Sequence, residues 1–448
     1  MRLTRRLGLF EGVALSLSVI APTMAMAFNV TLAAQAAGRA APLAFAVGTA
    51  VVAVVGLAFV SFARRTAHAG SAYAYLRASF GPRAGFLAGW LLLLTYLCFA
   101  TATAGLTGNF LQAALANHGI GTRWIWLPVS AASVVLAVAF AYRDMRLAGR
   151  LMLVLELVSV CALLALSALI LYRVGAAGGL SLAPFRPDAA AGGWAGVGFG
   201  IVYTVLSFAG FEGATTLGEE MRSPYRDIPR AVLGTVLVAG VFYVLVSYTQ
   251  VVGFGLDRVG ALAASDAPLN DLSLRFASAG VATAIDLAAA LSAFACTLGA
   301  LSAAARMLFA LGRGGGWPAV GTVHPVHGTP AWAVAACGVL ALAALLVIAP
   351  QVGVANYYGY AGTLGTLALI VVYLGVAAGS VRPAPGASLR WSGAAGVVLL
   401  LWPLGNSLVP LPPFPYNLLP YAVLLWAAAG AALMTLRPAV IEALPEAE

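Results

Sequence analysis

The chain has 448 residues, of which 62% are apolar or aromatic and only 9% are charged. Because soluble proteins carry roughly 25% charged residues, this composition excludes an ordinary soluble enzyme. The net charge is +9 and all 24 basic residues are arginine, but these arginines are scattered between long apolar runs and form no basic face, which argues against a nucleic-acid partner.

Apolar windows recur along the whole chain, each near the ~20 residues that a helix needs to cross the hydrocarbon of a lipid bilayer. They predict an all-α polytopic membrane protein with twelve transmembrane helices in a single domain, 1–448. The expected spans are 12–34, 41–63, 84–114, 123–141, 148–172, 194–217, 229–253, 279–311, 330–349, 354–379, 391–409 and 417–436.

The arginines predict the orientation of these spans. With the N-terminus inside, 18 of the 24 arginines fall on the cytoplasmic side, because positive loops are retained there. The remaining six would be external: Arg39, Arg123, Arg173, Arg186, Arg258 and Arg275. We therefore expect a multi-pass protein of the cytoplasmic (inner) membrane with both termini in the cytoplasm.

Two of the spans contain sequences that break helices. Pro22 lies in the middle of the first span, where it removes a backbone hydrogen bond and clashes with the preceding turn. In the sixth span, Gly210 and Gly213 surround Glu212. Non-helical backbone survives at membrane depth only where it is buried in protein or lines a cavity, so two such breaks indicate a functional site.

The broken spans begin two successive five-span blocks, 12–172 and 194–379, which are followed by two additional helices at 391–436. This arrangement predicts a five-plus-five inverted repeat whose broken helices 1 and 6 face each other at the bilayer midplane.

The expected chemistry of the breaks follows from their backbone. Freed N–H groups at the first break can hold a carboxylate, and freed carbonyls at the second can accept from an ammonium group. An amino acid carries both groups. The predicted substrate-binding residues are Ile20, Ala21, Pro22, Thr23, Met24, Ala25, Phe208, Ala209, Gly210 and Glu212.

Three segments carry a resemblance to a known family. Segment 69–90 reads AGSAYAYLRASFGPRAGFLAGW, segment 210–231 reads GFEGATTLGEEMRSPYRDIPRA, and segment 305–314 reads ARMLFALGRG. Together they resemble motifs of the amino acid-polyamine-organocation (APC) superfamily, and more narrowly of its bacterial amino acid permeases. The likeness covers nearly the whole chain.

The resemblance implies a permease that moves neutral amino acids by alternating access as a secondary-active, proton-coupled symporter. A polyamine or ethanolamine-type amine permease is the alternative, as is a sodium-coupled or exchange mode. The chain departs from the family at the first break, where the usual glycine-rich segment reads Ala21-Pro22-Thr23. It also has Leu206 near the position where several members carry an aromatic lid over the substrate, and Phe208, Tyr357 or Tyr358 is an alternative lid.

Ionisable groups within the spans are candidates for coupling, since a charge at the centre of a membrane helix costs at least ~2.5 kcal/mol. Some family members carry the coupled proton on a lysine of the fifth span, which aligns with Ser159 here. The chain has no lysine, so Glu156, one turn away, is the substitute. The alternatives are a structural acid for Glu156 and a structural brace for Glu212.

Sodium is the rival coupling ion, and hydroxyl groups on the eighth span would bind it. Asp286, near the external end of that span, is expected to reach water. The coupling or gating candidates are Glu156, Ser159, Glu212, Leu206, Ser292 and Thr297.

Other functional classes lack support in the sequence. The four cysteines show no CxxC spacing, and no HExxH motif occurs, so we expect no metal, no cofactor and no enzyme activity. A channel would need a continuous polar pore, and the spans contain no repeat of polar residues. No oligomeric state follows from the sequence.

Overall fold

The computed structural model describes residues 8–438 except 10–12, 14–15, 18–19, 65–71, 122, 144–145, 218–220, 222, 314–316, 318, 326 and 383–388. Of residues 146–153, 214, 216–217 and 224 only the backbone is described. The described part of the chain is helical and contains no β-strand, as the composition predicts.

The helices follow the expected spans to within a few residues at most ends. The long helices are α2 (Pro22–Ala37), α3 (Ala41–Ala63), α5 (Pro82–Ala116), α6 (Trp126–Tyr142), α7 (Arg146–Ala176), α8 (Gly193–Ser207), α9 (Pro224–Phe254), α12 (Ala279–Gly312), α13 (Ala331–Val352), α14 (Val354–Val381), α15 (Arg390–Asn406) and α16 (Leu419–Leu436). The short ones are α4 (Ala72–Phe80), η1 (Ala183–Phe185), η2 (Pro187–Ala189), η3 (Phe211–Leu217), η4 (Leu256–Arg258), α10 (Val259–Ala263), α11 (Pro268–Phe276) and η5 (Tyr416–Leu418).

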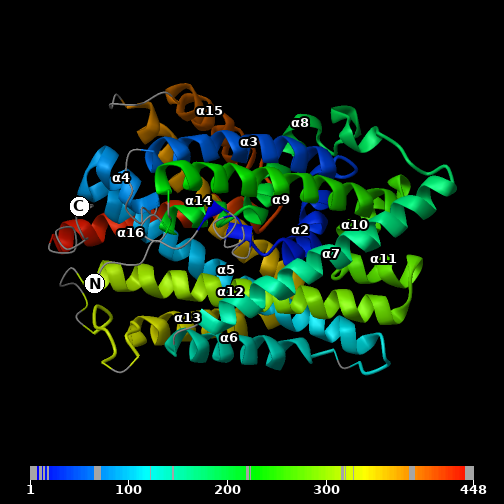
Figure 1. Ribbon diagram of the computed structural model, residues 1–448, viewed down its shortest axis with the longest axis horizontal. Coiled ribbons are helices and arrows are strands. Elements are labelled where there is room, and N and C mark those ends of the chain that lie inside the picture. Colours follow the sequence, from blue (N-terminus) through cyan, green and yellow to red (C-terminus); the bar gives the residue numbers. More distant parts are fainter. Residues whose placement is uncertain are drawn as a thin grey trace.

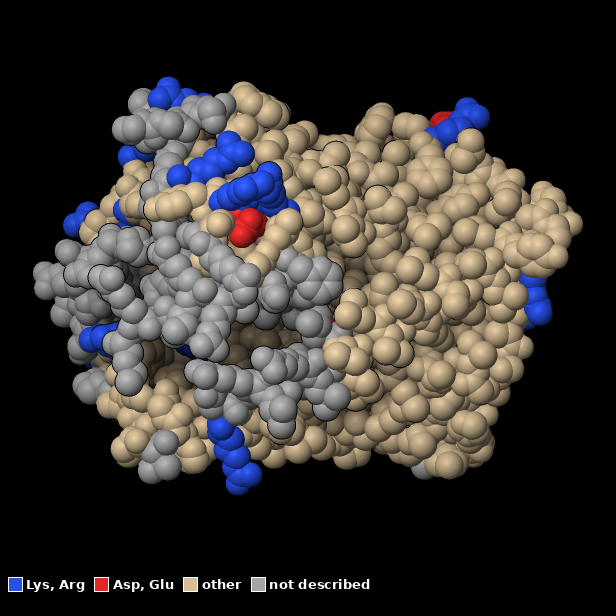
Figure 2. Space-filling view, viewed as in Figure 1, with Lys and Arg blue, Asp and Glu red and all other residues tan. Residues whose placement is uncertain are grey.

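Nine helical segments in the described part are long and apolar enough to cross a membrane, and α6 is a shorter apolar helix. Several helices begin at a proline, which lacks the N–H that the first turn of a helix leaves unpaired. The long helices run along the long axis of the molecule (Figure 1). Figure 2 shows arginines and acids toward the two ends of this face, with a broad uncharged surface between them. The chain is a multi-pass membrane protein.

The interior helices pack closely where small residues meet. α5 lies along α12 and α14, and α3 lies against both α8 and α9. A β-carbon on Gly48 of α3 would lie 2.6 Å from Cβ of Thr204 in α8, and one on Gly240 of α9 would overlap Thr49 of α3. These glycines therefore allow α3, α8 and α9 to approach one another more closely than larger residues would.

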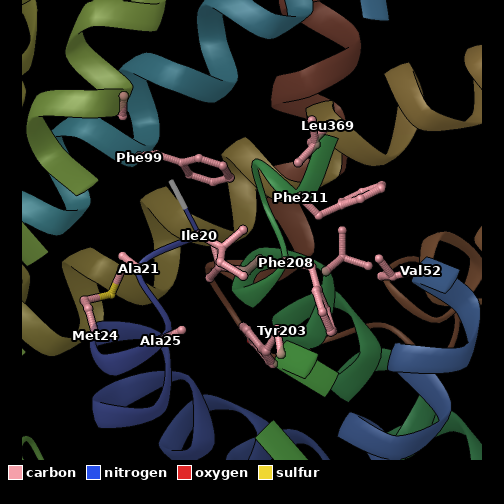
Figure 3. Packing of buried hydrophobic residues seen from close by; sticks show 14 of the residues in the cluster. Ile20, Ala21, Met24, Ala25, Val52, Phe99, Tyr203, Phe208, Phe211 and Leu369 are labelled. Atoms are coloured by element: carbon pink, nitrogen blue, oxygen red, sulfur yellow. The ribbon is translucent and has the colours of Figure 1, made fainter. Parts of the chain in front are cut away.

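Both predicted helix breaks are present in the structure. Ile20 is helical, Ala21 is left-handed with φ +45°, and α2 starts at Pro22. In the second break, α8 ends at Ser207, residues 208–210 form a turn in which Gly210 has φ +101°, and the 3₁₀ helix η3 follows. α2 packs against α8, so the two interruptions share one interior region (Figure 3).

Candidate binding site at the two helix breaks

The first turn of α2 is held by side chains from two other helices. Pro22 has no N–H. The N–H of Thr23 donates to Oε1 of Glu156 in α7 over 2.8 Å, and the N–H of Met24 donates to Oγ of Ser292 in α12 over 3.1 Å. The N–H of Ala25 donates to the Ala21 carbonyl and begins the regular helix. All the orphan amides of this helix start therefore have partners.

The side chains that form these two hydrogen bonds are buried. Glu156 is 6% exposed, Ser292 3% and Thr23 fully buried. A buried carboxylate is tolerated only when hydrogen bonds replace its hydration. The N–H groups of the first turn and the positive end of α2 suit a carboxyl group, and in this structure the side chain of Glu156 occupies the Thr23 N–H.

The second break is closed by different contacts. The hydroxyl of Tyr243 in α9 donates to the Ser207 carbonyl over 2.7 Å, and the ring of Phe208 packs edge-on against Tyr243 with centroids 4.9 Å apart. The Phe208 and Gly210 carbonyls accept from N–H groups further along the turn. The Ala209 carbonyl has no hydrogen-bond donor among the described residues, so it is available to a ligand.

Glu212 lies at the start of η3 and contacts a cluster of aromatic rings. Its Oε2 accepts from the hydroxyl of Tyr373 in α14 over 2.8 Å. Tyr373, Phe59 of α3 and Phe211 pack edge-on in a triangle with centroids 5.5–5.6 Å apart. The ring of Tyr75, from α4, lies 6.0 Å from Phe59. The short helix α4 therefore closes one side of this aromatic cluster.

A polar bridge connects the two broken helices to α14. Asn29 of α2 donates to Oγ of Ser207 over 2.8 Å, and its Oδ1 accepts from the hydroxyl of Tyr358 over 2.7 Å. The same hydroxyl lies 3.8 Å from the sulfur of Met24. All these side chains are buried, so the bridge fixes the relative position of α2 and α8.

The remaining substrate candidates surround these contacts. Figure 3 shows Ile20 and Ala21 on the interrupted chain of the first break, with Phe208 and Phe211 on the second. Ile20, Ala21, Ala25 and Phe208 are buried. Leu206, 9% exposed, lies beside Gly362 of α14. The structure thus brings the predicted substrate residues into one interior region.

The remaining candidates for coupling and for the lid form hydrogen bonds with groups on the helices. Ser159 donates back to the Leu155 carbonyl of its own helix over 2.7 Å. Thr297 donates to the Ala293 carbonyl over 3.0 Å and its hydroxyl lies 2.9 Å from that of Thr103. Among the lid alternatives, Tyr357 bonds Thr101 at 2.5 Å, whereas Tyr358 belongs to the bridge beside the first break.

The expectation that Asp286 reaches water is wrong. This residue is 2% exposed, and its Oδ2 accepts from the side-chain amides of Asn270 and, over 3.3 Å, Asn117. Helix α11, which supplies Asn270, packs against α12, and the hydropathy pattern does not reveal that contact. The motif pair Glu219 and Glu220 lies outside the described residues.

Comparisons with known proteins identify the family to which the chain belongs. The profile of the amino acid permease family matches residues 12–409. The chain is 26% identical over 313 residues to the low-affinity putrescine importer PlaP of Escherichia coli (strain K12), which covers 68% of this chain and 66% of PlaP. It is 27% identical over 315 residues to the branched-chain amino acid permease BcaP of Lactococcus lactis subsp. cremoris, covering 67% of each. The chain thus spans about two thirds of the length of these relatives.

A solved structure shares the fold. The manganese transporter of Eremococcus coleocola aligns with a TM-score of 0.57 over 99% of this chain and 98% of that one, at 10% sequence identity. At this identity the likeness concerns the arrangement of helices and not the ligand.

Proposed function

Because the chain belongs to the amino acid permease family, we propose that it is a secondary-active transporter that moves neutral amino acids across the cytoplasmic membrane by alternating access, coupled to protons. The observation that carries the proposal is the carboxylate site at the start of α2, opposite a second break with an available carbonyl. The relative named as a branched-chain amino acid permease supports neutral amino acids as substrates, and the relative named as a putrescine importer supports the amine alternative.

In this proposal twelve helices span the inner membrane with both termini in the cytoplasm. Blocks 12–172 and 194–379 form an inverted repeat, and 391–436 adds two helices. The agreement of the helix ends with the expected spans supports this count, as does the occurrence of a break in the first helix of each block. The transporter releases its substrate unchanged and needs neither cofactor nor metal.

The substrate would lie between the two breaks. Its carboxylate would accept from the N–H groups of Thr23 and Met24, and its ammonium group would donate to the Ala209 carbonyl. The apolar side chains of Ile20 and Phe208 would contact its side chain. We infer a binding segment of Ile20–Ala25 and Phe208–Glu212, with a gating role for Leu206.

We propose that Glu156 carries the coupled proton. Its carboxylate contacts the break directly, whereas the hydroxyl of Ser159 bonds its own helix. Sodium is less well supported, since Ser292 already accepts from Met24 and the Thr297 hydroxyl bonds Ala293 and contacts Thr103. Glu212, bonded to Tyr373, is proposed to gate the second break.

A second candidate substrate class is an amine without a carboxylate. Its support is electrostatic, because each break has a carboxyl group, Glu156 or Glu212. Both groups accept hydrogen bonds, and among the described residues neither has an arginine in a salt bridge with it. A cationic amine would supply the missing positive charge.

Uptake by the purified protein in liposomes tests the proposal. Radiolabelled leucine, alanine and putrescine are offered with an imposed gradient that is acidic outside, in sodium-free buffer. Saturable accumulation of leucine or alanine that a proton ionophore abolishes is the expected result. Accumulation that requires sodium would overturn proton coupling, and transport of putrescine alone would favour the amine class.

A further inference from the structure

We propose that Glu156 and the carboxylate of an amino acid substrate compete for the N–H groups at the start of α2, so that substrate binding displaces Glu156 and loads it with the coupled proton. The inference rests on the proposed transport function and adds the event that links substrate to proton.

The geometry allows only one carboxylate at this place. Oε1 of Glu156 occupies the Thr23 N–H at 2.8 Å, and Ser292 holds the adjacent Met24 N–H. The Ser292 hydroxyl also lies close to the Glu156 side chain. The Thr23 hydroxyl also lies close to the Glu156 carboxylate, but it forms no hydrogen bond with any described residue. A second carboxylate at these donors would meet a like charge at contact distance, which strongly disfavours two ionised groups.

Among the described residues, no positively charged group lies against Glu156 to replace the N–H that it would lose. α7 packs against α2, α9, α11 and α12. The titratable groups that face Glu156 are Tyr243 of α9 and Cys296 of α12, and ordinary pKa values leave both uncharged at pH 7. α11 lies near Ile170, which is about 20 Å further along α7 at 1.5 Å per residue. A displaced Glu156 anion would lose the Thr23 N–H and, among the described residues, would gain no charged partner, so its burial would carry a cost that protonation removes.

The proposed step balances in atoms and charge. The substrate carboxylate takes the hydrogen bond from the Thr23 N–H, while Glu156 accepts a proton from external water and forms an O–H bond. After the carrier opens to the cytoplasm, the amino acid leaves, Glu156 releases the proton to internal water, and its carboxylate returns to Thr23. One proton and one zwitterion cross together. An amine without a carboxylate binds with Glu156 still in place and needs no added proton.

A matched pair of probes separates these cases. Leucine and 3-methylbutylamine differ only by the carboxylate. Their binding to the detergent-purified, full-length protein is measured calorimetrically between about pH 5.5 and 7.5, where both probes keep a constant charge. Each titration is repeated in two buffers of different ionisation enthalpy, which reports the number of protons taken up.

At pH values above the pKa of Glu156 in the empty carrier, we expect leucine binding to take up about one proton. In this range the affinity for leucine should fall about tenfold for each unit of rising pH. The amine should take up none. In Glu156→Gln, which keeps a hydrogen-bond acceptor but cannot ionise, leucine binding should lose both proton uptake and pH dependence. The matched control is Asp286→Asn, which changes a buried acid that bonds Asn270 and Asn117 instead of the break, and it should behave as the wild-type protein.

The outcomes separate failure of the inference from failure of the proposed function. Leucine binding without proton uptake, or with uptake that persists in Glu156→Gln, overturns the competition while leaving transport intact. Binding of the amine but of no amino acid also overturns it, because Glu156 would then never be displaced. If no amino acid or amine binds, the transport proposal itself fails. If Glu156→Gln does not fold, proton uptake by the wild-type protein on binding leucine, but not on binding 3-methylbutylamine, still tests the competition.

Discussion

The hydroxyl of Tyr373 donates to Oε2 of Glu212 over 2.8 Å, across 161 positions of the chain. A hydrogen bond between buried side chains is costly to break, because it leaves a buried polar group without a partner. This one connects the break after α8 to α14, and the rings of Phe59 and Phe211 hold the phenol in place. The position of the carboxylate in the second break therefore depends on a distant helix as well as on the local turn.

Removal of this hydroxyl should destabilise the protein. Tyr373→Phe keeps the ring but takes a donor from Glu212, and the expected loss is about 1–3 kcal/mol. Thermal unfolding in detergent should show a lower Tm. Tyr421→Phe, at a position that is 57% exposed, is the control and should leave the Tm unchanged. Equal Tm values for both variants would mean that the bond contributes nothing.

The bridge through Asn29 should behave as one unit. Asn29→Ala removes the partner of both Ser207 and Tyr358, and Tyr358→Phe removes only one of the two bonds. Because the residues share a bond, the double variant should be less destabilised than the sum of the single variants, with a coupling of about 0.5–3 kcal/mol. A double-mutant cycle on thermal or denaturant unfolding measures this coupling, and additive losses would contradict the bridge.

The left-handed backbone of Ala21 predicts a substitution that should stabilise the protein. An alanine with φ +45° is strained by roughly 1–2 kcal/mol, whereas glycine adopts this region freely. Ala21→Gly should therefore raise the Tm, and Ala21→Val should lower it, because a β-branched residue is disfavoured at positive φ. A Tm that ranks the three proteins as Gly, Ala, Val tests the strain, and Val above Ala would refute it.

Asp266, in the segment between α10 and α11, should make the stability of the protein depend on pH. Partial burial, followed by the nearby Asp271 carboxylate, raises the pKa of Asp266 above its usual value. A raised carboxyl pKa contributes stability that is present at low pH and is lost as pH rises through the folded-state pKa. Asp266→Asn should therefore raise the Tm at pH 7 and not near pH 4. Because the residue is largely solvent-exposed, the gain should stay below about 1 kcal/mol. Equal gains at both pH values would point to a cause other than ionisation.

Sequence patterns predicted the helices and the breaks for a physical reason. Hydrocarbon demands long apolar runs, so the helix ends follow composition, and Pro22 and Gly210 mark places where a helix cannot continue smoothly. The glycine-rich segment that the resemblance leads one to expect at the first break is replaced by Ala21, which nevertheless adopts the left-handed conformation that glycine favours.

The partners of the breaks could not be predicted in the same way. Glu156 and Ser292 lie 133 and 268 positions from the amides that they hold, and nothing local to the first span indicates them. Their contacts depend on how α7 and α12 pack, which one sequence does not specify. A polar side chain within an apolar span was the available signal, and it would also have drawn attention to Asn29, the partner of Tyr358 in the bridge.

The close approach of α3 to α8 and α9 limits how the molecule changes shape. Thr204 sits where a side chain at position 48 would be, and Thr49 does the same at position 240, so neither pair can slide along its contact without first separating. In the proposed alternating-access cycle, α3, α8 and α9 would therefore move together as a single body, with bending confined to the interrupted segments beside it.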